Sequence, residues 1–364
     1  MSEMLVDNTT NPVALLLHGP ASRPPTIEPV DEIKFHHPGY PDDCGILFSL
    51  PRLDRSSTPP NGVHYGTALT ACQIVANNAF HGYLATDREG SKRVDPDLLS
   101  RDHLLTKPDY WFIVPADGHP GPDPNPPPYP VVPSFRDWTF PHREMPNWPR
   151  PTGVDTDGSR CVITRVGGLL VKSCHLIPAA DEKWFKANHM AQWYGKHRGI
   201  DEKSNKITLR HDLYAAFDSH LFAVVPKADN YVVHQFFATD RFEREFASAF
   251  HNHIVLQPPE VLPELLFARF ARGVFMLVKA FIAQSGVGRN IVRLQAVDDE
   301  DRGIVTYTTE IEWLSPEELA DQYHDNDTDG EDRGGSRKRR RGGWHGLNVA
   351  PPLFGDSRGW SHRR

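Results

Sequence analysis

The chain has few cysteines, no long uninterrupted apolar run and no excess of positive charge. Its four cysteines lie far apart, at positions 44, 72, 161 and 174, and no CxxC pair occurs. This spacing excludes a disulfide scaffold and offers no paired-cysteine zinc site, so we expect a reducing compartment. The formal net charge of −7 excludes a protein that coats nucleic acid with its whole surface. Any phosphate contact must come from a local patch.

The sequence also offers no membrane span. Its longest apolar segment, residues 261–283, is interrupted by Glu264, Arg269, Arg272 and Lys279, which is typical of an amphipathic or buried helix. The first residues lack the basic start and long apolar run of a signal peptide. We therefore expect an intracellular protein without a membrane segment.

The 364 residues, of which 39% are hydrophobic and 33 are proline, predict a globular core with long irregular segments. Trp138, Phe140 and Trp148 lie among the prolines, so we expect an ordered strap from about residue 131 onward. The regions that we expect are a disordered leader (1–31), an N-terminal α+β region (32–115), a Pro-rich strap (116–160), a module with a candidate site (161–227), a mainly helical region (228–315) and a disordered charged tail (316–364).

The tail contains an acidic run followed by five consecutive basic residues, Arg337 to Arg341. Neither block can bury enough apolar surface to fold by itself. The basic run is typical of a nuclear localisation signal or of a phosphate-binding tail, although such runs also occur by chance.

Within the module we expect strands at 161–165 and 169–174 around a Gly167-Gly168 turn, with Cys161 and Cys174 as buried residues of that hairpin. A helix over 184–194, a loop around Asn205, a helix over 210–218 and a strand over 222–225 follow. Helices are also expected at 241–251 and 263–284, and the apolar stripe of the second predicts core packing.

Three residues of the module suggest hydrolytic chemistry. His175 closes a predicted strand, where a side chain that titrates near neutrality suits a general base. Asn205 follows about thirty residues later. Positions 214 and 218 lie on one face of the predicted helix, and Asp218 is a hard oxygen ligand suited to Mg²⁺ or Mn²⁺. These are the groups that phosphodiester hydrolysis requires.

The run Ser-Cys-His-Leu-Ile-Pro at 173–178, the run Asn-Lys-Ile-Thr-Leu-Arg at 205–210 and Phe217-Asp218 together resemble the HNH endonuclease module, in a variant common in fungal proteins. Matching segments extend over about residues 32–285. The resemblance implies an α+β chain with a ββα-metal module between an N-terminal α+β region and a C-terminal helical region. It also implies a divalent metal cofactor and a DNA or RNA substrate. In that reading His175 is the base, Asn205 orients the base or constrains the loop, and Asp218 binds the metal.

The chain departs from this pattern at Tyr214, where the family carries a histidine. A phenol, whose reference pKa is about 10, is a poor ligand for a divalent metal at neutral pH. His211, three residues earlier, could compensate in part. Either the metal affinity is reduced, or the chain has kept the fold and lost catalysis.

Between residues 181 and 210 seven basic residues outnumber four acidic ones. Lys203, Lys206 and Arg210 are the candidates for phosphate contacts, and a solvated polar face is the plainer alternative. Two hypotheses remain open: a metal-dependent HNH endonuclease, and an inactive HNH-fold module that binds nucleic acid or protein. The sequence does not set an oligomeric state.

Overall fold

The computed structural model describes residues 28–55, 60–94, 101–115, 127–151, 158–194, 199–256, 260–299 and 304–323. Helices and strands are mixed in these residues, which confirms the expected α+β class in its coarse form. None of the helices in these ranges is long and apolar enough to cross a membrane. The leader up to residue 27, strap residues 116–126 and the tail from residue 324, including the basic run 337–341, lie outside the described residues.

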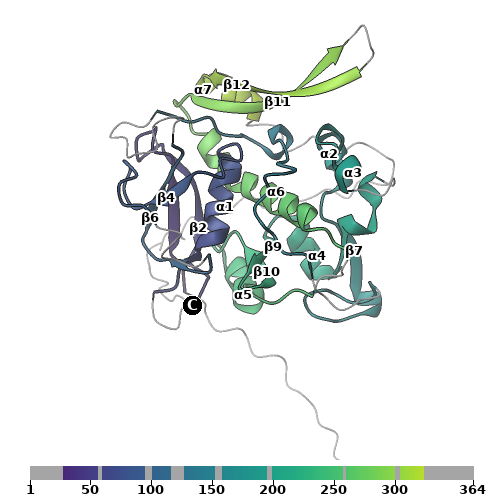
Figure 1. The fold of residues 1–364 in the computed structure, drawn as a ribbon. Coiled ribbons are helices and arrows are strands. Elements are labelled where there is room, and N and C mark those ends of the chain that lie inside the picture. Colours follow the sequence, from purple (N-terminus) through teal and green to yellow (C-terminus); the bar gives the residue numbers. More distant parts are fainter. Residues whose placement is uncertain are drawn as a thin grey trace, which may run out of the picture. The chain divides into compact units, whose positions relative to one another are not determined.

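The N-terminal region is built around a four-stranded sheet of order β2-β1-β6-β4 (Figure 1). Strand β1 is antiparallel to β2 and parallel to β6, and β6 is antiparallel to β4. Helix α1 begins at Tyr65 because the His64 side chain accepts from the backbone N–H of Thr67. The elements are β1 (Glu32–His36), β2 (Ile46–Pro51), β3 (Val63–His64), α1 (Tyr65–Val75), β4 (Tyr83–Ala85), β5 (Leu104–Leu105) and β6 (Asp109–Ile113).

The strap is held by its aromatic residues, as predicted. Trp138, Phe140 and Trp148 are buried. The Trp138 ring stacks on Trp184 of the following module at 5.8 Å between centroids, and the Trp184 indole donates to the Trp138 carbonyl at 2.7 Å. The strap, including the short helix η1 (Phe135–Asp137), therefore belongs to the core.

The module pairs two strands other than those expected. Residues 161–164 form a turn in which the Thr164 N–H points to the Cys161 sulfur, not a strand. Strand β7 instead pairs with β8, some thirty residues later. The expected hairpin around Gly167-Gly168 was wrong because Arg165 takes a left-handed conformation (φ 62°) that ends extended structure there. Cys161 and Cys174 are buried, as predicted.

The expected helix over 184–194 is interrupted at His189, whose φ of 51° breaks it into α2 and α3. Asn205 lies at the end of a short 3-10 helix directly before β8. The module comprises η2 (Gly168–Leu170), β7 (Val171–His175), η3 (Ala179–Asp181), α2 (Glu182–Ala187), α3 (Met190–Tyr194), η4 (Gly199–Asp201), η5 (Lys203–Asn205), β8 (Lys206–Arg210), α4 (His211–Asp218) and β9 (Phe222–Lys227).

Helix α6 (Pro263–Ile282) is the central element of the core. It contacts β9, β2 and α1 and so joins the module to the N-terminal region (Figure 1). Phe270, Val274 and Phe281 on its apolar stripe are buried and Leu277 is half-buried, which confirms the core prediction. Between β9 and α6 lie β10 (Asn230–Gln235), which pairs with β9, and α5 (Arg241–Phe250), which starts with an Asp240/Glu243 capping box.

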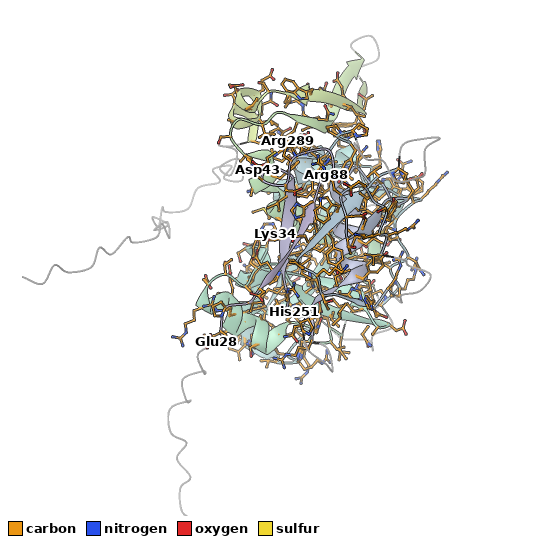
Figure 2. The ribbon with its side chains drawn as sticks, turned by 90° about the vertical axis from the view of Figure 1, so that its left-hand side faces the viewer. Glu28, Lys34, Asp43, Arg88, His251 and Arg289 are labelled. Atoms are coloured by element: carbon orange, nitrogen blue, oxygen red, sulfur yellow. The ribbon has the colours of Figure 1, made fainter. Side chains whose placement is uncertain are left out.

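The expectation of a mainly helical region at 228–315 missed a long hairpin of β11 (Arg289–Asp299) and β12 (Ile304–Leu314). Both strands contain Ile and Val, and β12 also contains Thr, residues that favour strands. Helix α7 (Pro316–Tyr323) then occupies the first residues of the expected disordered tail. Arg289, the first residue of β11, anchors the hairpin, because its side chain donates to the Cys44 carbonyl at 2.8 Å. Figure 2 labels Arg289 and Asp43, the residue before Cys44.

Candidate functional site

The predicted site residues lie on strands β7 and β8, on the loop between them and on helix α4. In the antiparallel pair His175 lies opposite Lys206, and Val171 lies opposite Arg210. Helix α4 follows β8 without an intervening residue. The first turn of α4 therefore lies at the Val171 end of the hairpin, about 13 Å along the strand from His175.

Helix α4 packs on β7. The Lys172 ammonium of β7 lies 3.9 Å from the centre of the Tyr214 ring of α4. Burial raises the pKa of the Cys174 thiol to about 12, Arg269 opposes this rise, and the Asp218 carboxylate adds to it. Asp218 is the last residue of α4, one turn after Tyr214.

His175 is half-exposed and paired with a carboxylate that the sequence did not single out. Its Nε2 lies 2.9 Å from Oδ1 of Asp201, in the loop between β7 and β8. The hydrogen bonds from His175 and Lys206 hold the pKa of Asp201 below its usual value. With Nε2–H donating to Asp201, Nδ1 keeps its lone pair. That nitrogen is the atom that can accept a proton from water.

Asn205 is buried and uses both ends of its amide within the module. Its Nδ2 donates to the carbonyls of Ile177 and Ile200, and its Oδ1 accepts from the Ile177 N–H, all at 2.8–2.9 Å. Ile177 lies two residues after His175, the last residue of β7. Asn205 thus holds the chain that leaves His175 and is a positioning residue.

The predicted metal ligands on α4 do not form a complete donor set. His211 is exposed at the first position of α4, seven residues or about 10 Å of helix rise before Asp218. Tyr214 faces an ammonium group. Among the described residues, the one group of three His, Cys, Asp or Glu donors close enough for a common ion lies elsewhere. The side chains at α4 therefore do not fit a tightly bound divalent metal, and Asp218 is the single carboxylate of the predicted set.

Two of the three predicted phosphate-binding cations already have carboxylate partners. Lys206 lies 3.3 Å from Asp201. Arg210 makes two bonds to Asp212, at 2.6 and 2.7 Å. Lys203 is exposed, so it is the member of the set whose charge is most accessible to a phosphate.

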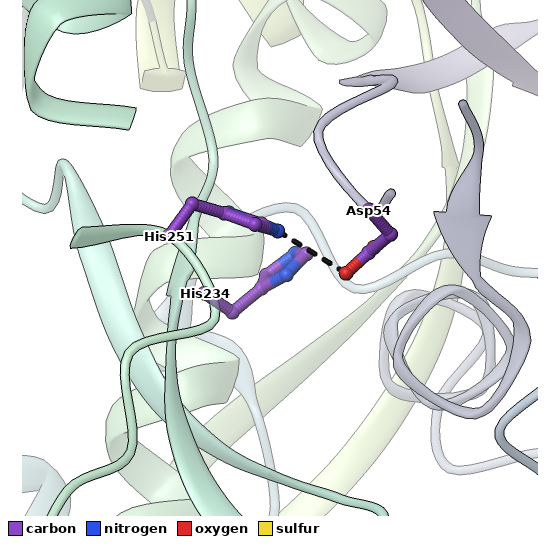
Figure 3. Close-up of side chains that lie close together, drawn as sticks. All are labelled: Asp54, His234 and His251. Atoms are coloured by element: carbon purple, nitrogen blue, oxygen red, sulfur yellow. Dashed lines mark hydrogen bonds and ion pairs between the residues drawn. The ribbon is translucent and has the colours of Figure 1, made fainter. Parts of the chain in front are cut away.

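The group of three donors is Asp54, His234 and His251, and sequence reasoning missed it. Their ligand atoms lie within 4.8 Å of one another (Figure 3). Asp54 follows β2, His234 is on β10 and His251 ends α5. His251 is 197 residues from Asp54, so no spacing rule could connect them. The adjacent His251-Asn252 pair was the only local signal.

The place of a cation in this group is taken by the Lys227 ammonium. Its Nζ lies 2.6 Å from Asp54 Oδ1, 3.1 Å from His234 Nδ1 and 2.9 Å from Asn252 Oδ1. Burial alone would raise the pKa of Asp54, but Lys227 and His251 hold it well below its usual value. Burial lowers the pKa of Lys227, and the charge of Asp54 opposes this shift.

The two histidines are also oriented against metal binding. A metal-ligating histidine normally donates its other ring N–H to an acceptor. His251 Nδ1 instead accepts from the Gln235 N–H at 3.3 Å, and His234 Nε2 is buried without a hydrogen-bond partner among the described residues. We interpret the group as a polar connection between the N-terminal region and the β9–α5 segment, not as a metal centre.

Comparison with known proteins is informative for the module alone. Residues 161–225 match the HNH endonuclease family. No curated protein and no solved structure matches the chain. The match covers the turn at Cys161, β7 with His175, the Asn205 loop, α4 and most of β9. Residues 161–225 are therefore similar to an HNH endonuclease domain, which suggests a nuclease-type function for this part of the chain.

Proposed function

We propose that this chain is an HNH endonuclease that hydrolyses phosphodiester bonds of DNA or RNA through a weakened metal site. The observation that carries the proposal is the His175–Asp201 pair at the end of β7, with the Asn205 loop behind it. HNH nucleases act on nucleic acids, and His175 lies within residues 161–225, which match this family.

In the proposed reaction Nδ1 of His175 accepts a proton from water, and the water oxygen forms a bond to phosphorus. The P–O bond to one ester oxygen breaks, and that oxygen takes a proton from solvent. Asp201 keeps the ring in the tautomer whose Nδ1 is free. Asn205 fixes the loop, and Lys203, Lys206 and Arg210 are proposed to lie along the phosphates.

A divalent ion such as Mg²⁺ or Mn²⁺ would supply charge neutralisation at the phosphate when bound. Asp218 is the proposed donor, with Tyr214 and His211 as the weak remainder of the predicted set. Because one carboxylate holds such an ion poorly, we expect slow cleavage.

A second candidate is an inactive module that binds nucleic acid or protein. The Lys172–Tyr214 contact favours it, because the positive charge of the Lys172 ammonium, 3.9 Å from the ring centre, would repel a divalent ion bound beside residue 214. Import into the nucleus through residues 337–341 stays a prediction.

The two candidates are separated by cleavage of supercoiled plasmid and of labelled single-stranded DNA and RNA by the full chain, with and without Mg²⁺ or Mn²⁺. We expect weak cleavage by the wild type, its loss in His175→Ala, and an increase in both cleavage and metal affinity in Tyr214→His. His253→Ala, which changes an exposed histidine outside the module, is the matched control.

Cleavage that survives His175→Ala would mark a contaminant or a wrong base. No cleavage by either the wild type or Tyr214→His would favour the inactive module. Strong Mg²⁺-dependent cleavage by the wild type that Tyr214→His leaves unchanged or lowers would make the phenol a working part of the site.

A further inference from the structure

Two adjacent leucines of the HNH domain project into solvent. Leu169 is 98% exposed and Leu170 is 58% exposed, both in η2 directly before β7. Single exposed apolar residues are ordinary, but two neighbouring leucines at a tip mark a contact surface.

The leucine pair is held by its flanking backbone. Gly167 forms a β-bridge with Arg160, and the Val171 N–H donates to the Gly168 carbonyl. Gly168 has a φ of 71° and open space around it, which turns the chain outward. The leucines therefore stand on a fixed tip at the start of β7.

The surroundings of the tip are basic. Arg160 and Lys172 are exposed beside it, one guanidinium nitrogen of Arg165 is buried, and Asp212, at the neighbouring start of α4, is paired with Arg210. Arg160 is exposed, and its Nη1 donates a hydrogen bond to the Arg165 carbonyl at 3.1 Å, which keeps the side chain beside the tip. The leucine pair is apolar and its exposed neighbours are basic. Such a surface is complementary to a nucleic acid, which has stacked bases inside and charged phosphates outside.

We propose that Leu169 and Leu170 form a wedge that inserts between stacked base pairs of duplex DNA from the minor groove. The exposed Arg160 and Lys172 would contact the flanking phosphates. Proteins that bend DNA in this way insert side chains such as Leu at a base step and open it. The inference rests on the proposed function for its nucleic-acid substrate, and it narrows that substrate to duplex DNA.

The position of the wedge relative to His175 fits this role. His175 lies five positions after Leu170, or about 16 Å along the extended chain. With a spacing of about 3.4 Å per base pair along one strand, the wedge would open the duplex about five steps from the phosphate at His175. A membrane is a poorer occupant, because interfacial anchoring requires a larger apolar face than two side chains.

Bending can be measured without cleavage. The full chain is added, in EDTA, to a duplex of about 30 base pairs that carries a donor and an acceptor dye at its ends. We expect energy transfer to rise on binding, and we expect Leu169→Ala/Leu170→Ala to abolish the rise and weaken binding about tenfold. Phe242→Ala, which removes a 62% exposed aromatic ring from α5, is the matched control and should behave like the wild type.

Parallel titrations with duplex RNA, single-stranded DNA and anionic phospholipid vesicles test the choice of occupant. The proposal is overturned if the wild type does not bind duplex DNA, if it binds without bending, or if the double variant bends DNA as well as the wild type does. It is also overturned if the leucines matter only for vesicles. Bending without any cleavage would support the wedge while removing the endonuclease assignment, so the two failures are distinguishable.

Discussion

Asn205 shows at the scale of a residue why a motif residue need not touch the substrate. Its amide is buried and makes three hydrogen bonds within the loop that follows His175. Asp201, in contrast, was not part of the motif and yet its carboxylate bonds the His175 ring nitrogen Nε2. The motif residue Asn205 therefore holds the loop that follows His175, whereas Asp201, which the motif does not include, contacts the His175 ring.

Substitution of Asn205 by Ala should lower the free energy of unfolding by about 3 kcal/mol, because it leaves buried N–H and C=O groups without partners. Urea denaturation of both proteins measures the change. Asn230→Ala, which removes an amide from an exposed turn, should cost less than about 0.5 kcal/mol. Equal effects of the two substitutions would show that the Asn205 bonds do not stabilise the loop.

Helix α6 is the element on which the fold depends, because it joins β2 and α1 to β9. Helix α6 packs closely at Gly273 against Phe236, which lies in the connection between β10 and α5. A Cβ atom added there would lie 2.3 Å from Cε2 of Phe236. The glycine is therefore explained by packing and not by helix propensity.

Gly273→Ala should destabilise the protein by about 1–3 kcal/mol through this overlap, although alanine in an open helix position would stabilise by about 1 kcal/mol. Thermal and urea unfolding give the sign directly. The double variant Gly273→Ala/Phe236→Leu should recover part of the loss, since the smaller side chain vacates the contact. A stabilised single variant would contradict the packing explanation.

At the scale of the whole molecule, a buried ion pair connects distant segments. Asp54 Oδ1 and Lys227 Nζ are 2.6 Å apart and both side chains are buried. His251 and Asn252 bond the same carboxylate oxygen. One carboxylate thus binds the loop after β2 to the end of β9 and to the end of α5.

Asp54→Asn should cost about 3–5 kcal/mol, because it leaves the Lys227 ammonium buried without an opposite charge. Lys227→Met should have a similar cost for the complementary reason. The double variant should cost clearly less than the sum of the two, and a double-mutant cycle of urea unfolding measures this coupling. Additive costs would mean that the pair does not interact in the folded protein.

The buried histidines predict sensitivity to mild acid. Burial lowers the pKa of His37 to about 3, and burial together with Arg272 and Arg269 lowers that of His220 to about 2. Below the ordinary value of 6.5 the unfolded chain takes up protons that the folded protein excludes. Stability therefore falls as the pH falls from 6.5 toward 3, by about 1.4 kcal/mol per pH unit for each histidine.

Together these two histidines should remove about 5 kcal/mol between pH 6.5 and pH 4.5. Urea unfolding across this range measures the slope. His220→Asn, which suits the positive φ of 62° at this position, should make the slope shallower, whereas His253→Gln at an exposed position should not change it. A pH-independent free energy of unfolding would contradict the prediction.

The sequence by itself determined the features that depend on neighbouring residues. The order of β7, the Asn205 loop and α4, the core stripe of α6 and the aromatic strap all follow from local spacing and apolar periodicity. The family resemblance of the module was likewise visible in contiguous runs. The strand pairing was not, because residues 161–165 and β8 are both plausible partners for β7 until the left-handed Arg165 excludes the first.

Tertiary structure alone decided which side chains share a site. Asp201 meets His175 across a loop, the Lys172 ammonium covers Tyr214, and the Asp54 group joins residues as much as 197 positions apart. The exposure of the Leu169–Leu170 tip also became visible only in the folded structure. The physical reason is the same in each case. The spacing of residues in the sequence determines which near neighbours can touch, whereas contacts between distant residues depend on the packing of the whole core.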